Sequence, residues 1–143
     1  MVVPARMGIV TLGVADLDRS IAFYRALGWE RCESSIDGEI SWFRTADGYL
    51  GLFPYEELAA DARIESPSRG TFDGVTLAIT VATEEEVGPA LDAAAAAGAT
   101  ILKPATRLPF GLSGYFADPD GYPWEVAYNP SFPLDERGRM TIP

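Results

Sequence analysis

The chain of 143 residues contains no histidine and a single cysteine, and these two absences exclude whole classes of site. Without histidine, serine–histidine and cysteine–histidine catalysis cannot arise within the chain, and no metal can be held by imidazole. Cys32 has no second cysteine with which to form an intrachain disulfide or a thiolate zinc site. Any metal would therefore be a hard ion bound by oxygen atoms.

The sequence also lacks long apolar segments and an excess of basic residues. No apolar run approaches the roughly 20 residues that a membrane helix needs, and no basic-then-apolar signal pattern precedes Asp16. The 21 acidic side chains outnumber the 11 basic ones, which gives a net charge of −10. Because nucleic acids and anionic membranes attract basic proteins, we expect neither as a partner, and we expect a cytoplasmic location.

The composition and length predict one globular domain over residues 1–143, with 48% hydrophobic and 22% charged residues. A β-branched apolar strand is predicted at 8–14, followed by a helix that Asp16 caps and Gly28 ends. Two strands are predicted next, over 29–35 and 39–44, and the hairpin turn Asp37-Gly38 joins them. A further strand is predicted over 49–53. Residues 54–73 are rich in proline, glycine and acidic residues, which indicates a linker with a short helix at 55–63.

The same order of elements then begins again. A strand is predicted at 75–81, and Thr83 with Glu86 forms a capping box for an alanine-rich helix that ends at Gly98. Pro89 predicts a kink or a late start in this helix. Strands at 100–103, 114–117 and 124–128 follow, with a loop over 104–113 and an aperiodic extension over 129–143. Two copies of strand–helix–strand–strand–strand indicate an internal duplication.

Two motifs resemble those of a known family. The segment Val14-Ala-Asp-Leu-Asp-Arg-Ser-Ile-Ala-Phe-Tyr-Arg-Ala-Leu-Gly28 is similar to its opening strand–helix signature, and Asp118-Pro-Asp-Gly-Tyr-Pro-Trp-Glu125 is similar to its closing one. The family is the glyoxalase / bleomycin-resistance / extradiol-dioxygenase superfamily, also called vicinal oxygen chelate. The resemblance covers about 7–128. It implies an α+β fold of two βαβββ modules, about 7–53 and 74–128, whose strands form an open, curled mixed sheet around a cleft with flanking helices. It also implies a homodimer.

The resemblance implies four metal positions on the first and last strands of the modules, and the residues here do not suit a metal. Strand matching places Ile9, Thr76, Leu52 and Glu125 at these positions. Only Glu125 is a good ligand, and metal sites in proteins use three or four. We therefore expect no metal and no cofactor. Glu125 remains a candidate general base, with a structural role beside an arginine or water as the alternative.

Several further residues are candidates for binding a ligand in the implied cleft. Strand alternation places Trp124 under the helices and Glu125 on the other face. On the strand at 39–44, either Trp42 with Arg44 or Phe43 lines the cleft, and alternation alone leaves both choices open. The remaining candidates lie on the first strands of the modules and near the loop over 104–113: Thr11, Thr76, Phe110 and Tyr115.

These observations predict a metal-independent protein that binds a small molecule in its cleft. The resemblance implies sequestration of an antibiotic-like or other small organic ligand, and the charge of −10 favours a cationic aromatic one. One alternative is a lyase, isomerase or dioxygenase-like enzyme of the same superfamily. Another is a protein that keeps the fold without an active site.

Overall fold

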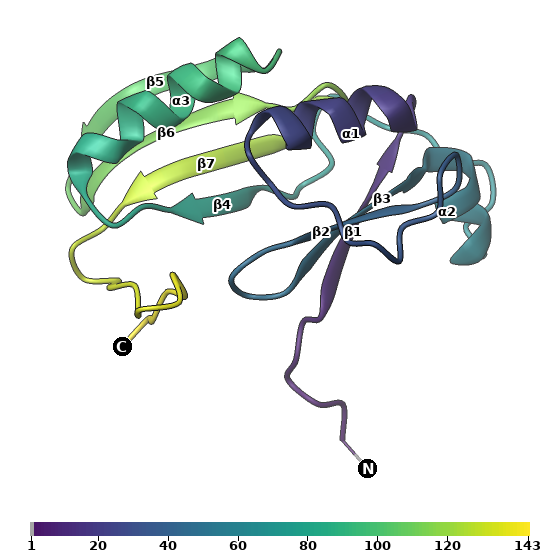
Figure 1. Cartoon of the computed structure of the whole chain (residues 1–143), viewed down its shortest axis with the longest axis horizontal. Helices are drawn as coiled ribbons and strands as arrows, with labels where there is room; N and C mark the ends of the chain where they lie inside the picture. The colour runs from purple at the N-terminus through teal and green to yellow at the C-terminus, as the bar shows by residue number, and fades with distance from the viewer. Residues whose placement is uncertain (1) are drawn as a thin grey trace. The chain divides into compact units, whose positions relative to one another are not determined.

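The computed structural model describes residues 2–143 and divides into two compact units, Met1–Pro67 and Ser68–Pro143 (Figure 1). The boundary falls inside the predicted linker at 54–73. Each unit has its own sheet and helices, and the predicted α+β fold is confirmed. Within the described residues, every helix is too short or too polar to cross a membrane.

Unit 1 contains a three-stranded sheet in the order β1-β3-β2. Its elements in chain order are β1 (Ile9–Val14), α1 (Leu17–Ala26), β2 (Ser41–Arg44), β3 (Tyr49–Pro54) and α2 (Tyr55–Asp61). Strand β3 pairs in parallel with β1 and antiparallel with β2. The strand predicted at 29–35 is reduced to a single bridge between Arg31 and Phe43, because it lies at the sheet edge and turns away after Cys32.

Local chemistry fixes the ends of α1 as the sequence predicts. The Asp16 carboxylate accepts a hydrogen bond from the Arg19 backbone N–H at 3.1 Å, and Gly28 adopts a φ of +89° that suits glycine. One face of α1 then packs onto the sheet, where the ring of Tyr24 lies 5.9 Å from that of Phe43. Both side chains are 0% exposed, so they form the centre of the core of unit 1.

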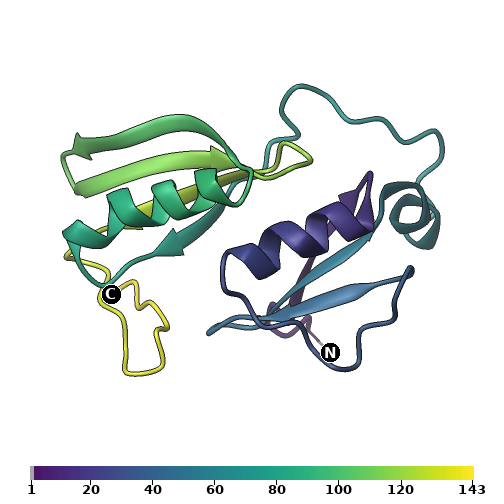
Figure 2. The same cartoon turned by 45° about the horizontal axis from the view of Figure 1, so that its top comes forward.

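Unit 2 contains a four-stranded sheet in the order β4-β7-β6-β5, with one helix across it (Figure 2). Its elements are β4 (Leu77–Thr80), the 3-10 turn η1 (Glu84–Glu86), α3 (Val87–Ala96), β5 (Thr100–Leu108), β6 (Gly111–Ala117) and β7 (Pro123–Tyr128). The loop predicted at 104–113 is wrong, since most of it belongs to β5 and β6. Pro104 is tolerated there because β5 is an edge strand with irregular register on both sides of Lys103.

The start of α3 follows the predicted capping chemistry. The Thr83 backbone N–H donates to the Glu86 carboxylate at 2.7 Å, completing the capping box. The chain first makes the η1 turn and becomes α-helical only at Val87. Pro89 thus lies in the first turn of α3, where a missing N–H costs little, and the predicted late start is confirmed.

The two faces of the unit 2 sheet differ in what covers them. A Cβ at Gly114 would lie 2.6 Å from the Leu91 side chain of α3, so the Gly114 side of β6 is the face under the helix. Phe116 and Trp124 share this face by register, and their rings stack with centroids 6.3 Å apart. Trp124 is 5% exposed, which confirms its predicted core position. We call the opposite face of this sheet the open face.

We predict that Gly114→Ala destabilises the protein by about 1–3 kcal/mol, because the added methyl group would overlap Leu91 and the Lys103 carbonyl oxygen. Urea unfolding monitored by tryptophan fluorescence measures the change. Gly88→Ala is the matched control, since its Cβ position in α3 has no described atom within 4 Å apart from its chain neighbours and the backbone of its own helix. That variant should gain roughly 0.5–1 kcal/mol of helix stability. Equal midpoints for both variants would contradict the proposed contact.

Candidate functional site

The open face of unit 2 brings together two of the residues predicted from the sequence. Tyr115 on β6 lies directly opposite Glu125 on β7, and both side chains are half-buried. Partial burial raises the pKa of the Tyr115 phenol, and the nearby Glu125 carboxylate raises it further. At neutral pH the phenol therefore stays protonated and can donate a hydrogen bond beside a carboxylate.

The Glu125 carboxylate has no partner of its own. Within residues 2–143, no hydrogen bond or ion pair joins the Glu125 carboxylate to another side chain or to a backbone group. Of the two partners that the structural alternative names, an arginine is therefore not paired with Glu125 in the described chain, and water remains. A half-buried carboxylate with free acceptor positions can bind a cationic group or accept a proton.

A second row of side chains crosses the open face next to this pair, and sequence reasoning missed it. Ser113 on β6 lies opposite Ala127 on β7 and Thr106 on β5, while Thr80 on β4 lies opposite Ala127. Ser113 is 0% exposed, and its hydroxyl oxygen makes no hydrogen bond within the described chain. The sequence did contain one signal for this residue. Alternate residues of a strand share a face, so Ser113 lies on the same face of β6 as Tyr115.

The C-terminal extension reaches the edge of this second row. The Thr80 hydroxyl donates to the Met140 sulfur at 3.2 Å, and a bridge between Leu134 and Met140 folds the extension back on itself. Asp135 stabilises that turn by accepting hydrogen bonds from the backbone N–H groups of Arg137 and Arg139, each at 2.9 Å. The extension thus contacts unit 2 beside the residues of the open face.

Unit 1 places the other predicted residues of the first module on the face opposite α1. Trp42 pairs in register with Gly51, and Thr11 pairs with the same glycine from the other side. Gly51 makes room for them, because a Cβ there would lie 2.8 Å from the Thr11 hydroxyl oxygen. Arg44 on the same face donates to the Tyr49 hydroxyl at 2.9 Å. The sequence left open whether Trp42 with Arg44, or Phe43, faces the implied cleft. In the structure, Trp42 and Arg44 lie on the face opposite α1.

Phe43 and Leu52 lie on the α1 side of the unit 1 sheet. Both are 0% exposed, and Phe43 packs against Tyr24, so neither is accessible to a ligand. The strand matching that equated Leu52 with Glu125 is therefore wrong by one residue, because Leu52 faces α1. Gly51 and Phe53 are the β3 residues on the face opposite α1. A shift of one residue reverses every side chain of a strand.

The two remaining predicted residues, Thr76 and Phe110, lie just outside the strands of unit 2. Thr76 is exposed and precedes β4, which begins at Leu77. Phe110 lies in the turn between β5 and β6 and is 40% exposed. It precedes Tyr115 by five residues, or roughly 16 Å along an extended strand. Phe110 therefore does not contact the Tyr115–Glu125 pair through its own strand position, whereas Thr76 lies two residues before Ala78, the β4 residue opposite Glu125.

The available donors do not fit the metal centre that the fold family implies. Among residues 2–143, no three side chains of the Asp, Glu, Cys or His types lie close enough together to hold a metal ion. On the open face, Glu125 has serine, threonine and tyrosine hydroxyls as neighbours, which are weak ligands while protonated. No chemistry through a bound metal is derived for this chain.

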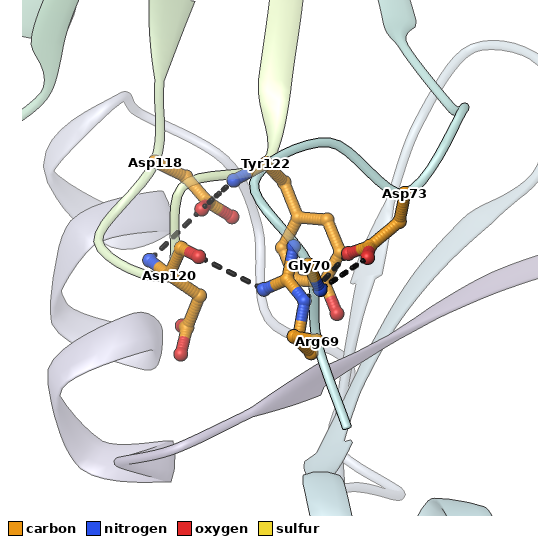
Figure 3. A network of polar contacts seen from close by, with 6 residues as sticks. All are labelled: Arg69, Gly70, Asp73, Asp118, Asp120 and Tyr122. Carbon is orange, nitrogen blue, oxygen red and sulfur yellow. Dashed lines mark hydrogen bonds and ion pairs between the residues drawn. The ribbon is translucent and has the colours of Figure 1, made fainter. Parts of the chain in front are cut away.

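The turn that leads into β7 is held by a compact polar network (Figure 3). The Asp118 carboxylate accepts hydrogen bonds from the backbone N–H groups of Asp120 and Tyr122, at 3.0 and 2.9 Å. The Arg69 guanidinium lies 3.8 Å from the centre of the Tyr122 ring and donates to the Asp120 carbonyl oxygen and the Asp73 carboxylate, at 2.8 and 2.7 Å. The start of unit 2 is thereby fastened to the β6–β7 turn, three residues before Glu125.

We predict a pH-dependent contribution of Asp73 to stability. Hydrogen bonds from Arg69 and from the Gly70 backbone N–H lower the pKa of Asp73 in the folded protein. Because the folded-state pKa lies below the unfolded value of about 3.9, the stabilisation is present above that value and disappears as the pH falls through the folded-state pKa. Asp73→Asn should lower the melting midpoint at pH 7, and the difference from wild type should vanish under strongly acidic conditions.

The control for this variant is Asp92→Asn, because Asp92 is exposed on α3 and has no hydrogen-bond partner among the described residues. Melting midpoints of all three proteins, measured between pH 2 and pH 7, test the prediction. A deficit of Asp73→Asn that stays constant over this range would show that the charge of Asp73 does not contribute.

Comparisons with known proteins agree with this architecture. The family model described as Glyoxalase/Bleomycin resistance protein/Dioxygenase superfamily matches residues 6–126. The crystal structure of a glyoxalase-related enzyme from Fulvimarina pelagi is similar at 33% identity and a TM-score of 0.84, covering 96% of this chain and 98% of the other. A lactoylglutathione lyase from Agrobacterium tumefaciens is similar at 27% identity and a TM-score of 0.67, covering 87% and 94%. The search of curated proteins gave no match.

Proposed function

Because the chain belongs to the Glyoxalase/Bleomycin resistance protein/Dioxygenase superfamily, we propose that it binds a small organic cation on the open face of unit 2, without a metal. The observation that carries the proposal is the Glu125 carboxylate, which is half-buried opposite the Tyr115 ring and has no partner among the described residues. Partial burial deprives a carboxylate of water, and a ligand cation replaces the lost interaction. Tyr115 adds an aromatic surface for that cation.

The net charge of the chain supports the sign of the ligand. An excess of acidic residues raises the local concentration of cations and repels anions, most strongly at low ionic strength. A protein that sequesters an antibiotic-like amine needs such a preference together with an apolar surface. Storage or removal of the ligand requires no bond to break, so binding alone needs no further acid or base beside Glu125.

An enzyme is the second candidate, and the similarity to the glyoxalase-related enzyme from Fulvimarina pelagi favours it. In that case Glu125 would remove a proton from the bound substrate and the Tyr115 hydroxyl would donate a hydrogen bond to the resulting anion. Turnover of an α-proton, measured by exchange with deuterated solvent, separates this candidate from a pure binder. A fold without a site would show neither binding nor exchange.

We predict that ligand affinity follows the charge of the ligand. Tryptamine, tryptophol and indole-3-acetate carry a cationic, a neutral and an anionic group on the same ring. Isothermal titration calorimetry should rank their affinities in that order. Glu125→Gln should weaken tryptamine binding by roughly 10- to 100-fold, because a hydrogen bond to a charged group contributes about 1.5–3 kcal/mol.

Matched measurements separate a binding role of Glu125 from a structural one. Asp92→Asn removes an acidic charge from α3, which covers the other face of the same sheet, and should leave tryptamine affinity unchanged. The melting midpoint of Glu125→Gln should equal that of wild type, since no described residue pairs with Glu125. Equal affinity of wild type for all three indoles would overturn the proposal.

We also predict that the purified protein carries no stoichiometric transition metal. The reason is the donor set, in which Glu125 is the one strong ligand on the open face of the described chain. Elemental analysis for zinc, nickel, iron and manganese after dialysis tests this. About one equivalent of any of these metals per chain would contradict it and would require ligands from outside this face.

A further inference from the structure

The open face of unit 2 carries the single lysine of the protein. Lys103 is the one lysine in the sequence, and the other basic side chains are all arginines. It lies on β5 directly opposite Tyr115 on β6, and Tyr115 lies directly opposite Glu125 on β7. Residues that pair across neighbouring strands share a face, so these three side chains form one row across the sheet. We call Lys103, Tyr115 and Glu125 the charged row.

The register of β5 places Lys103 and Arg107 on opposite faces. Two register shifts flank Lys103, and its own pairing with Tyr115 is kept between them. Arg107 pairs with Leu112, which lies three residues from Tyr115 on β6 and therefore points to the other side of the sheet. There Arg107 forms an ion pair with Glu84, in the turn that leads into α3. Of these two basic side chains, Lys103 is thus the one on the open face.

Both charged ends of the charged row lack a partner in the described chain. The Lys103 ammonium group makes no hydrogen bond or ion pair with any of residues 2–143, and the same holds for the Glu125 carboxylate. All three side chains of the row are half-buried, so each keeps a surface that a ligand can reach. Ala78, which flanks Glu125 on β4, is exposed and has no polar side-chain atom. A group that binds anions and a group that binds cations are thus accessible on either side of an aromatic ring.

The separation of the two charged ends fits a ligand that lies across the Tyr115 ring. One strand stands between Lys103 and Glu125, so their backbones are roughly 9–10 Å apart, which is two strand spacings. No ion pair joins the two side chains in the part of the chain that the structure describes. A molecule with an ammonium and a carboxylate group on opposite sides of an aromatic ring would pair with both ends and place its ring against Tyr115.

We propose that Lys103 is a specificity-determining residue, whose ammonium group binds a carboxylate on the same ligand whose cation binds Glu125. This inference rests on the proposed function and narrows the ligand to an aromatic zwitterion. The carboxylate binds together with the cation and not alone, because Glu125 and the net charge of −10 repel an anion that has no positive group.

The pair 4-(aminomethyl)benzoate and 4-methylbenzylamine tests this inference, because both have an aromatic ring and an ammonium group and they differ in one carboxylate. In isothermal titration calorimetry, wild-type protein should bind the first more tightly by about 3- to 30-fold. This range remains when the ordering of the lysine side chain offsets part of a charged hydrogen bond. Lys103→Met should remove the ratio, and Lys103→Arg should keep it. Arg107→Met is the matched control, because it removes a positive charge from the other face of the same strand, and it should also keep the ratio.

The outcomes separate this inference from the proposed function on which it rests. A wild-type preference for 4-methylbenzylamine over 4-methylbenzyl alcohol without any gain from the carboxylate overturns the role of Lys103 and leaves the role of Glu125 intact. Loss of the preference for the amine overturns both. The melting midpoints of Lys103→Met and Lys103→Arg should equal that of wild type, since no described residue pairs with the ammonium group. Loss of the ratio in the arginine variant as well as in the methionine variant would show that the charge of Lys103 does not select the ligand, and would overturn the inference.

Discussion

The contact between Leu91 of α3 and the bare backbone of Gly114 decides which way the four-stranded sheet of unit 2 faces. The helix can approach β6 closely only where no side chain intervenes. Because alternate residues of a strand point to opposite sides, this one contact assigns Phe116 and Trp124 to the core. It equally assigns Tyr115 and Glu125 to the open face. The binding role proposed for that face thus depends on a packing interaction on its reverse side.

Most local features could be predicted because they depend on neighbouring residues in the chain. The Asp16 cap, the positive φ of Gly28 and the capping box of Thr83 all follow from short-range hydrogen bonds or glycine geometry. The turn at Asp118 belongs to the same class, since its carboxylate bonds to two backbone N–H groups within four residues. Such signals do not require knowledge of what packs where.

The failures concern tertiary context. A loop was predicted over 104–113, yet β5 continues through Pro104 because an edge strand tolerates a residue without an N–H. Leu52 was matched to Glu125 strand against strand, yet its side chain points to the opposite face and lies in the core. Ser113 was missed because nothing in the residues 111–117 reveals that its hydroxyl is buried without a partner. Whether a side chain is buried, and whether it finds a hydrogen-bond partner, depends on the neighbouring strands. The local sequence does not specify these strands.

The two units follow one plan and treat polar side chains in opposite ways. In unit 1, Arg44 is engaged by the Tyr49 hydroxyl and by the aromatic face of the same ring, and Arg31 is engaged by Ser41 and Asp37. In unit 2, partners of this kind are present at the linker, where Arg69 bonds Asp73 and Asp120. On the open face, Glu125 and Ser113 have no such partners among the described residues. The half-buried Glu125 carboxylate differs from the fully buried Ser113 hydroxyl in that a ligand can reach it. A cationic ligand would supply the partner that this carboxylate lacks among the described residues.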